Sequence, residues 1–302
     1  MGVKRVVLLC KTGVPLIRAT SDSRILQKEI SMQFIDLAAQ QRRIRGRIEA
    51  NIAAILDHGR YIMGPEIQSL EKKLADYAGV EHASACASGT DALLLALMAY
   101  DIGPGDAIFT SPFTFIATGE VISLLGATPV FVDIEPQTFN LDPVKLEQAI
   151  QAIAGHSAND QPLPQSEVSL TAKGIIAVDL FGLPADYDRI NAIARNHHLF
   201  VLEDAAQSFG AEYHGKMAGN LSHIGCTSFF SAKPLGCYGD GGMCFTNDEK
   251  LAEKMESLRV HGKGTHKYDN VRTGINGRMD TLQAAILLAK FEIFPEEIEL
   301  RQ

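Results

Sequence analysis

The chain has 302 residues, of which 46% are hydrophobic and 21% charged, a balance that supports a large folded core and argues against a disordered chain. Its formal net charge of −8 argues against a nucleic-acid or acidic-membrane partner. The five cysteines form no C-x-x-C pair, so we expect reduced thiols in a cytoplasmic protein and no metal site. No apolar run reaches the ~18 residues that a membrane span needs.

The predicted elements begin only after an N-terminal stretch, residues 1–31, that fits poorly with the rest. Isoleucines recur at helical spacing from Ile44 to Ile55, and a second amphipathic helix is predicted over residues 66–78. From residue 82, strands alternate with helices; the strands are HASACAS, DAIFTS, TPVFVDI, GIIAVDLFG and LFVLEDAA. This alternation predicts an α/β fold whose mostly parallel sheet carries helices on both faces. Ligands of such sheets bind where the strands end.

The first candidate site is Ser88-Gly89-Thr90, between a predicted strand and a helix. Small residues let the backbone approach a ligand, and a helix N-terminus with hydroxyls suits a phosphate. The alternative is that Ser88 or Thr90 is an ordinary N-cap. Taken alone, the motif leaves both interpretations open.

The second candidate is the acidic pair that closes the strand Val201-Leu202-Glu203-Asp204. A carboxylate at a buried strand end is costly unless a cation or a strong donor pairs with it. A protonated pyridine nitrogen is such a partner. The alternative is that Asp204 caps the next helix.

The third candidate is Lys233, which follows an apolar run and precedes a glycine-rich stretch in SFFSAKPLGCYGDGG. A lysine that loses hydration becomes a usable amine nucleophile, as a Schiff base requires. The alternative is a lysine that extends to solvent from a strand end. With Ser228 upstream, the three sites supply a phosphate anchor, a ring-nitrogen acid and an imine lysine, which together indicate pyridoxal 5'-phosphate (PLP). No G-x-G-x-x-G, P-loop or G-x-S-x-G motif competes.

From about Met32 onward the chain resembles the DegT/DnrJ/EryC1/StrS sugar-nucleotide aminotransferases, which are fold type I PLP enzymes. The blocks that carry the resemblance are GRYIMGPE, ASGTDALLLAL, PFTFIATGEVISLLGATPVFVDI, EDAAQSFGAEY, SFFSAKPLGCYGDGG and GINGRMDTLQAAILLAKFEIF. They are most similar to the subgroup that aminates the 3-keto form of UDP-N-acetylglucosaminuronic acid. The resemblance implies a seven-stranded sheet, a large PLP-binding domain over residues 32–260, and the start of a small domain over 261–302.

The resemblance also implies a role for each position. Lys233 would form the imine with PLP and carry the proton, Asp204 would pair with the pyridinium nitrogen, and Gln207 would contact the ring hydroxyl. Phe115 would stack on the ring, while Ser88, Gly89, Thr90 and Ser228 lie at the phosphate. Asn276 would reach the phosphate of a neighbouring subunit, and Arg278 would bind the substrate carboxylate through its planar guanidinium.

Two departures from the family pattern concern the ends of the chain. Residues 1–31 have no counterpart in the family, so we expect an extension there. The chain stops at EIELRQ, within what looks like a long helix, whereas family members continue. We therefore expect a small domain that is incomplete in this chain.

The expected activity is transfer of an amino group from L-glutamate to a UDP-linked 3-ketosugar for surface polysaccharide, in a cytoplasmic homodimer with shared active sites. A sugar dehydratase of the same fold is disfavoured because those relatives carry histidine where Lys233 stands. The remaining alternative is a non-catalytic remnant or regulatory protein that binds PLP weakly or not at all.

Overall fold

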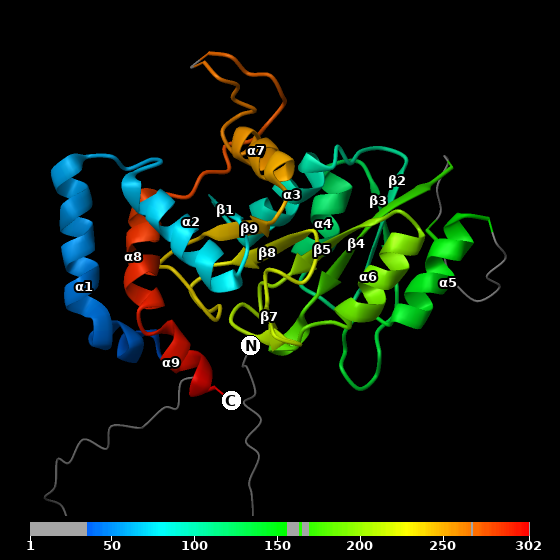
Figure 1. Cartoon of the computed structure of the whole chain (residues 1–302), viewed down its shortest axis with the longest axis horizontal. Coiled ribbons are helices and arrows are strands. Elements are labelled where there is room, and N and C mark those ends of the chain that lie inside the picture. The colour runs from blue at the N-terminus through cyan, green and yellow to red at the C-terminus, as the bar shows by residue number, and fades with distance from the viewer. Residues whose placement is uncertain (1–34, 156–162, 165–168, 267, 302) are drawn as a thin grey trace, which may run out of the picture. The chain divides into compact units, whose positions relative to one another are not determined.

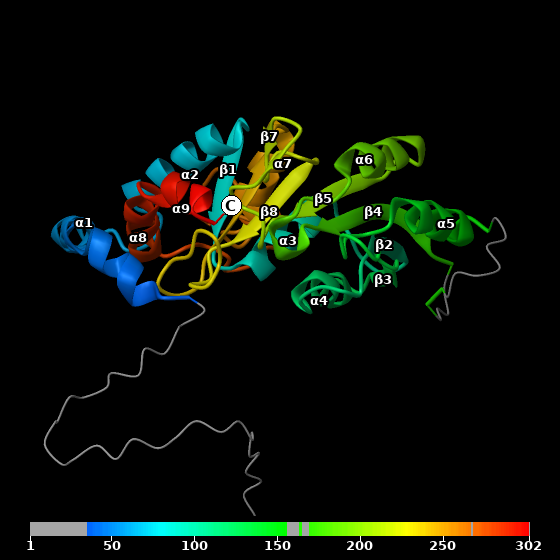
Figure 2. The ribbon, with the colours of Figure 1, turned by 90° about the horizontal axis from the view of Figure 1, so that it is seen from below.

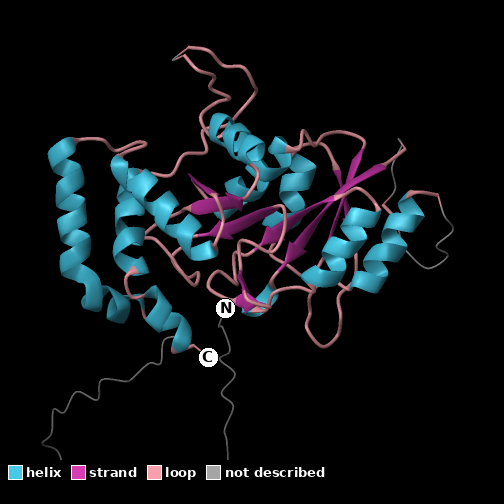
Figure 3. Ribbon diagram, in the orientation of Figure 1, coloured by secondary structure: helices cyan, strands magenta, loops and turns pink. Residues whose placement is uncertain are grey.

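The computed structural model describes residues 35–155, 163–164, 169–266 and 268–301 (Figure 1). The chain divides into two units, Met1–Asp36 and Leu37–Gln302, and the second is compact and contains the sheet and all the described helices. The predicted extension over residues 1–31 lies outside the described residues. The second unit has strands in its interior and helices on both sides of them, which confirms the predicted α/β class (Figure 3).

Seven strands form the central sheet in the order β1-β9-β8-β5-β4-β2-β3. Their bounds are β1 His82–Cys86, β2 Asp106–Thr110, β3 Thr128–Phe131, β4 Thr171–Val178, β5 Phe200–Asp204, β8 Ile224–Ser228 and β9 Gly242–Thr246. Strand β9 is antiparallel to both of its neighbours, and the remaining pairs are parallel. The mostly parallel, seven-stranded sheet is therefore confirmed. Strands β6 (Glu212–Tyr213) and β7 (Lys216–Met217) form a separate hairpin.

Successive residues of the central strands pack on opposite faces of the sheet, as the pleat of a strand requires. Ile176 of β4 and Leu202 of β5 belong to one apolar cluster, whereas Ile175 and Val201 belong to another. All four side chains are buried. Because each buried aliphatic side chain stabilises the fold by about 1.5–3 kcal/mol, continuous apolar strands favour a sheet that is covered on both faces.

Nine α-helices occur in the described residues: α1 Leu37–His58, α2 Pro65–Ala78, α3 Gly89–Ala99, α4 Ala117–Leu124, α5 Pro143–Ile153, α6 Tyr187–Asn196, α7 Glu249–Leu258, α8 Thr281–Phe291 and α9 Phe294–Glu299. Helices α3, α4 and α7 contribute to the cluster on one face, while α2, α5, α6 and α8 cover the other. Helix α1 packs on α8 at one end of the unit, where both views show the two side by side (Figures 1 and 2). None of the described helices is both long and apolar enough to cross a bilayer.

The prediction of one long helix at the end of the sequence is wrong. Helix α8 ends at Phe291 and the separate short helix α9 begins at Phe294. Pro295 explains the break, because it has no N–H for the carbonyl of Phe291 and its ring would clash with that carbonyl. Whether residues 261–302 begin a separate small domain stays a prediction.

Candidate active site

Three predicted site residues lie at the carboxyl ends of β1, β5 and β8, which run in the same direction. Ser88 follows β1, Asp204 ends β5, and Ser228 ends β8. Gly89 lies against Ser228, because a Cβ on Gly89 would stand 2.6 Å from the Ser228 Cβ. The fold therefore brings the predicted phosphate residues and the predicted ring acid to one edge of the sheet.

Ser88 is the N-cap of α3, as the alternative interpretation anticipated. Its side chain accepts a 3.0 Å hydrogen bond from the Asp91 N–H, and its carbonyl accepts one from the Ala92 N–H. Among the described residues, the N–H groups of Gly89 and Thr90 have no protein acceptor. These two donors and the positive end of the helix dipole are available to an anion.

The carboxylate of Asp204 is buried at the end of β5 and held by two donors. The Thr118 hydroxyl donates to Oδ2 at 2.9 Å, and the Ala206 N–H donates to Oδ1 at 3.2 Å. Burial raises the pKa of Asp204, whereas these two donors and the ammonium of Lys233 lower it. Asp204 therefore caps a turn rather than a helix, and Lys233 is close enough to influence its charge.

Lys233 is half-buried in a segment that connects β8 to β9, residues 229–241, here called the lysine loop. Phe229 closes this loop: its N–H donates to the Gly241 carbonyl at 2.7 Å, and its carbonyl accepts from the Cys237 N–H at 2.7 Å. The Lys233 N–H donates to the Phe230 carbonyl at 2.8 Å. The loop thus holds Lys233 through backbone hydrogen bonds beside the strand end at Ser228.

Gln207 and Phe115 flank this edge of the sheet. The side-chain carbonyl of Gln207 accepts a 3.0 Å hydrogen bond from the Phe181 N–H, and its amide NH2 has no protein acceptor in the described part of the chain. Phe115 lies just before α4 and is 68% exposed, which is high for an aromatic side chain. Their predicted contacts with a PLP ring stay predictions, and both side chains have unoccupied surface for such contacts.

Asn276 and Arg278 lie together on the segment that precedes α8. The Arg278 Nε donates to the Asn276 Oδ1 at 2.9 Å, and Arg278 pairs as an isolated bridge with Cys86 at the end of β1. Arg278 also lines a hollow of about 510 Å³ together with Ser88. Their predicted roles toward a phosphate and a carboxylate stay predictions.

Sequence reasoning missed two side chains that hold the site together. Thr118 lies within the FTFIAT block from which Phe115 was selected, four residues after Thr114, whose hydroxyl it contacts at 3.0 Å. Asp179, at the end of β4, accepts a 2.7 Å hydrogen bond from the Ser208 hydroxyl. The only signal for Asp179 was an acid after a buried strand, the same signal that indicated Asp204.

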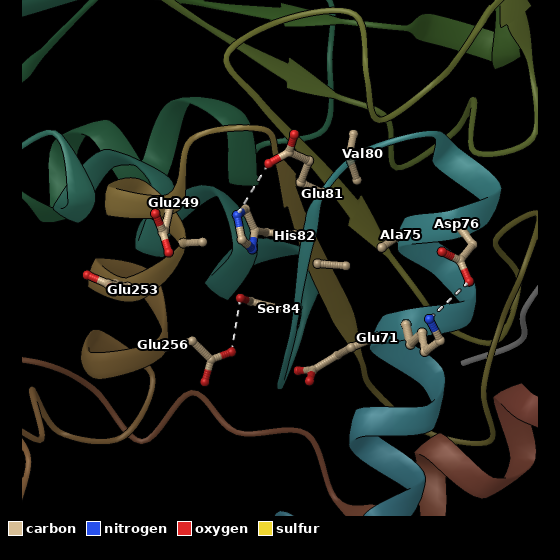
Figure 4. A pocket seen from close by; sticks show the side chains of 13 residues that line it. Glu71, Ala75, Asp76, Val80, Glu81, His82, Ser84, Glu249, Glu253 and Glu256 are labelled. Atoms are coloured by element: carbon tan, nitrogen blue, oxygen red, sulfur yellow. Dashed lines mark hydrogen bonds and ion pairs between the residues drawn. The ribbon is translucent and has the colours of Figure 1, made fainter.

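A second hollow, about 390 Å³, lies between α2 and α7 and contains none of the predicted site residues (Figure 4). Its lining is strongly acidic, with Glu71 on α2 and Glu249, Glu253 and Glu256 on α7. The buried Arg259 forms ion pairs with Glu71 and Glu256, so part of this charge is compensated. Across the described residues, no cluster of three or more potential metal ligands is assembled.

Comparison with known proteins places this architecture among sugar aminotransferases. Residues 42–302 match the model of the DegT/DnrJ/EryC1/StrS aminotransferase family. The chain is 52% identical over 271 residues to the UDP-2-acetamido-2-deoxy-3-oxo-D-glucuronate aminotransferase of Pseudomonas aeruginosa, covering 90% of this chain and 70% of the relative.

Solved structures agree with this result. A DegT DnrJ EryC1 StrS aminotransferase from Brucella abortus is 53% identical with a TM-score of 0.83, covering 88% of this chain and 68% of that one. NtdA from Bacillus subtilis, solved with bound cofactor PMP, is 31% identical with a TM-score of 0.75, covering 89% of this chain and 58% of that one. The predicted fold of PLP-dependent transferases is therefore confirmed.

Proposed function

Because the chain belongs to the DegT/DnrJ/EryC1/StrS aminotransferase family, we propose that it transfers an amino group to the 3-keto carbon of a nucleotide-linked sugar. The acceptor is UDP-2-acetamido-3-keto-glucuronic acid and the donor is L-glutamate. The product serves the synthesis of surface polysaccharide such as the O-antigen of lipopolysaccharide. One observation carries this proposal: the buried Asp204, Ser228 and the N-terminus of α3 lie at one edge of the sheet, where the loop that bears Lys233 begins.

Aminotransferases of this family depend on PLP, and the donor set of the described residues fits that cofactor. The free N–H groups of Gly89 and Thr90 suit its phosphate, and the free amide NH2 of Gln207 suits its ring oxygen. Asp204 is buried with a raised pKa, so a cationic ring nitrogen would stabilise its carboxylate. When bound, PLP supplies the carbonyl and the electron-withdrawing ring that carry the amino group.

Each residue then has a distinct task. The carboxylate of Asp204, with Oδ2 oriented by Thr118, would balance a positive charge at the ring nitrogen. Lys233 would hold the cofactor through Nζ and would carry a proton during amino transfer. Phe115 would exclude water from the ring.

The choice of a uronic acid acceptor rests on Arg278 and on the 52% identity to an aminotransferase named for such a substrate. A guanidinium binds both oxygens of a carboxylate through parallel hydrogen bonds. The Arg278 Nε already donates to Asn276, which fixes the guanidinium and leaves its terminal nitrogens for a ligand.

The active form is a cytoplasmic homodimer in which Asn276 and Arg278 act on the site of the partner copy. Mixing a Lys233→Ala variant with an Asn276→Ala variant tests this arrangement. Hybrid dimers would contain one site with both residues intact, so activity should return on mixing. If activity stays absent in mixtures that form hybrid dimers, Asn276 acts within its own subunit.

Covalent attachment of PLP is the first test of the function. The purified chain would be incubated with PLP, reduced with borohydride and digested, and we expect the modified peptide to contain Lys233. Lys233→Ala should lose both the modification and the visible absorption band. If PLP does not attach to the wild-type chain, the cofactor role of Lys233 is wrong; attachment without transfer from glutamate would favour a non-catalytic relative.

The acceptor is tested by comparing Arg278→Ala on two ketosugars, one with a uronate carboxylate and one neutral. Loss of a charge-assisted bidentate contact is expected to lower kcat/KM for the uronate by about 10- to 100-fold. The neutral sugar should be affected much less. An equal loss on both substrates would exclude a carboxylate role for Arg278.

A further inference from the structure

Helix α8 contacts Tyr238 of the lysine loop through both its backbone and its ring. The Tyr238 N–H donates to the Gln283 Oε1 at 3.0 Å, and the Gln283 Nε2 approaches the Tyr238 carbonyl at 3.4 Å. Two turns further along α8, the Lys290 Nζ lies 5.3 Å from the centroid of the Tyr238 ring. The Gln283 side chain thus hydrogen-bonds with both the backbone N–H and the backbone carbonyl of Tyr238.

Tyr238 follows the point at which the lysine loop closes. The Cys237 N–H donates to the Phe229 carbonyl, so residues 229–237 form a closed turn that carries Lys233. Any movement of Tyr238 therefore pulls on Cys237 and on this closure. The contact with Gln283 anchors the loop to α8 at Tyr238, on the C-terminal side of Lys233.

The surroundings leave little room for the loop to shift. A Cβ on Gly239 would lie 3.0 Å from the Gln283 Nε2, and one on Gly236 would lie 2.5 Å from the Ser231 carbonyl. Such close packing transmits a backbone displacement instead of absorbing it. The position of Gln283 is consequently linked to that of the peptide units around Lys233.

We propose that Gln283 is a positioning residue that fixes the lysine loop through Tyr238 and so sets where Lys233 stands relative to Asp204. Gln283 does not reach the reacting atoms itself. Because it concerns Lys233 as the cofactor lysine, this inference rests on the proposed function. The same contact joins the loop to α8, which directly follows the segment with Asn276 and Arg278.

Hydrogen exchange in the protein without added cofactor tests the anchor by itself. In Gln283→Ala the Tyr238 N–H loses its acceptor, and the peptide containing Tyr238 should exchange about 5- to 10-fold faster. Gln283→Glu keeps the acceptor oxygen and should restore slow exchange. Gln68→Ala, on the exposed face of α2, is the control and should leave the peptide unchanged. Unchanged exchange in Gln283→Ala would overturn the inference.

Covalent attachment of PLP then separates positioning from simple structural support. Gln283→Ala should need about 5- to 10-fold more PLP for half-maximal attachment at Lys233, and Gln283→Glu should behave nearly as wild type. Faster exchange with wild-type attachment would make Gln283 merely structural and overturn the inference. If the wild-type chain itself fails to attach PLP, the proposed function fails. The exchange experiment without cofactor still tests the Gln283 anchor in that case.

Discussion

The Thr118 hydroxyl donates a 2.9 Å hydrogen bond to the Asp204 Oδ2, which joins α4 to the end of β5. Both side chains are buried, so no solvent can replace this donor. The bond keeps one oxygen of the carboxylate directed and lowers a pKa that burial raises. The orientation of Asp204, the proposed ring acid, therefore depends on a side chain of α4.

Thr118→Val removes that donor while keeping the side-chain volume. A buried acceptor left without its partner costs about 1–3 kcal/mol, so we expect the free energy of unfolding to fall by that amount. Urea unfolding of the cofactor-free chain measures the change. Thr118→Ser retains the hydroxyl and should recover most of the loss; a Thr118→Val variant as stable as wild type would show that the bond contributes nothing.

Gly89→Ala places a methyl group 2.6 Å from the Ser228 Cβ at the N-terminus of α3. Overpacking of this kind costs about 1–3 kcal/mol of stability, and displacement of Ser228 should also weaken PLP binding. Gly46→Ala is the matched control, because Gly46 lies in α1 with no atom within 4 Å of the added Cβ. The free energy of unfolding of Gly46→Ala should rise by about 0.5–1 kcal/mol. Equal effects of the two substitutions would contradict the steric explanation.

Asp179 should make the stability of the cofactor-free chain fall as pH rises. Burial, with a smaller contribution from the Asp204 charge, raises the pKa of Asp179 to about 7. Between the ordinary value of 3.8 and about 7, the folded chain keeps a proton that the unfolded chain has lost, so raising the pH disfavours folding.

Asp179→Asn removes this titration, and its thermal midpoint should therefore decline less than that of wild type between pH 5 and pH 8. Scanning both proteins over that window measures the difference. Parallel midpoint curves would mean that Asp179 does not titrate in this range.

Lys290, unlike Asp179, should make the stability of the chain rise as pH rises, and at higher pH. Burial lowers its pKa to about 8, from an ordinary value of 10.5. Between these values the folded chain releases a proton that the unfolded chain retains, so stability gains a positive contribution as pH rises. Lys290→Met lacks this contribution, and thermal scans from pH 7 to pH 9.5 should show wild type gaining on the variant. A constant difference between them would contradict the lowered pKa.

The sequence alone was sufficient for strands β1 to β5 and for the order of the chemical groups, but it predicted neither strand β9 nor helix α7. Apolar strands that alternate with amphipathic helices leave few arrangements other than a parallel sheet covered on both faces. Parallel strands end at the same edge of a sheet. Asp204, Ser228 and Lys233 end or follow such strands, so the sequence predicted that they would lie at one edge of the sheet. The break at Pro295 was missed because helical spacing of apolar residues outweighed the proline.

Local pattern and family resemblance therefore predicted Ser88, Asp204 and Lys233 as site residues. Only the tertiary structure decided which neighbours hold them: Thr118 for Asp204, and Gln283, through Tyr238, for the lysine loop. Thr118 and Asp204 are 86 residues apart, and Gln283 and Tyr238 are 45 apart. No local pattern connects residues so far apart, because such contacts are set by how the helices pack on the sheet.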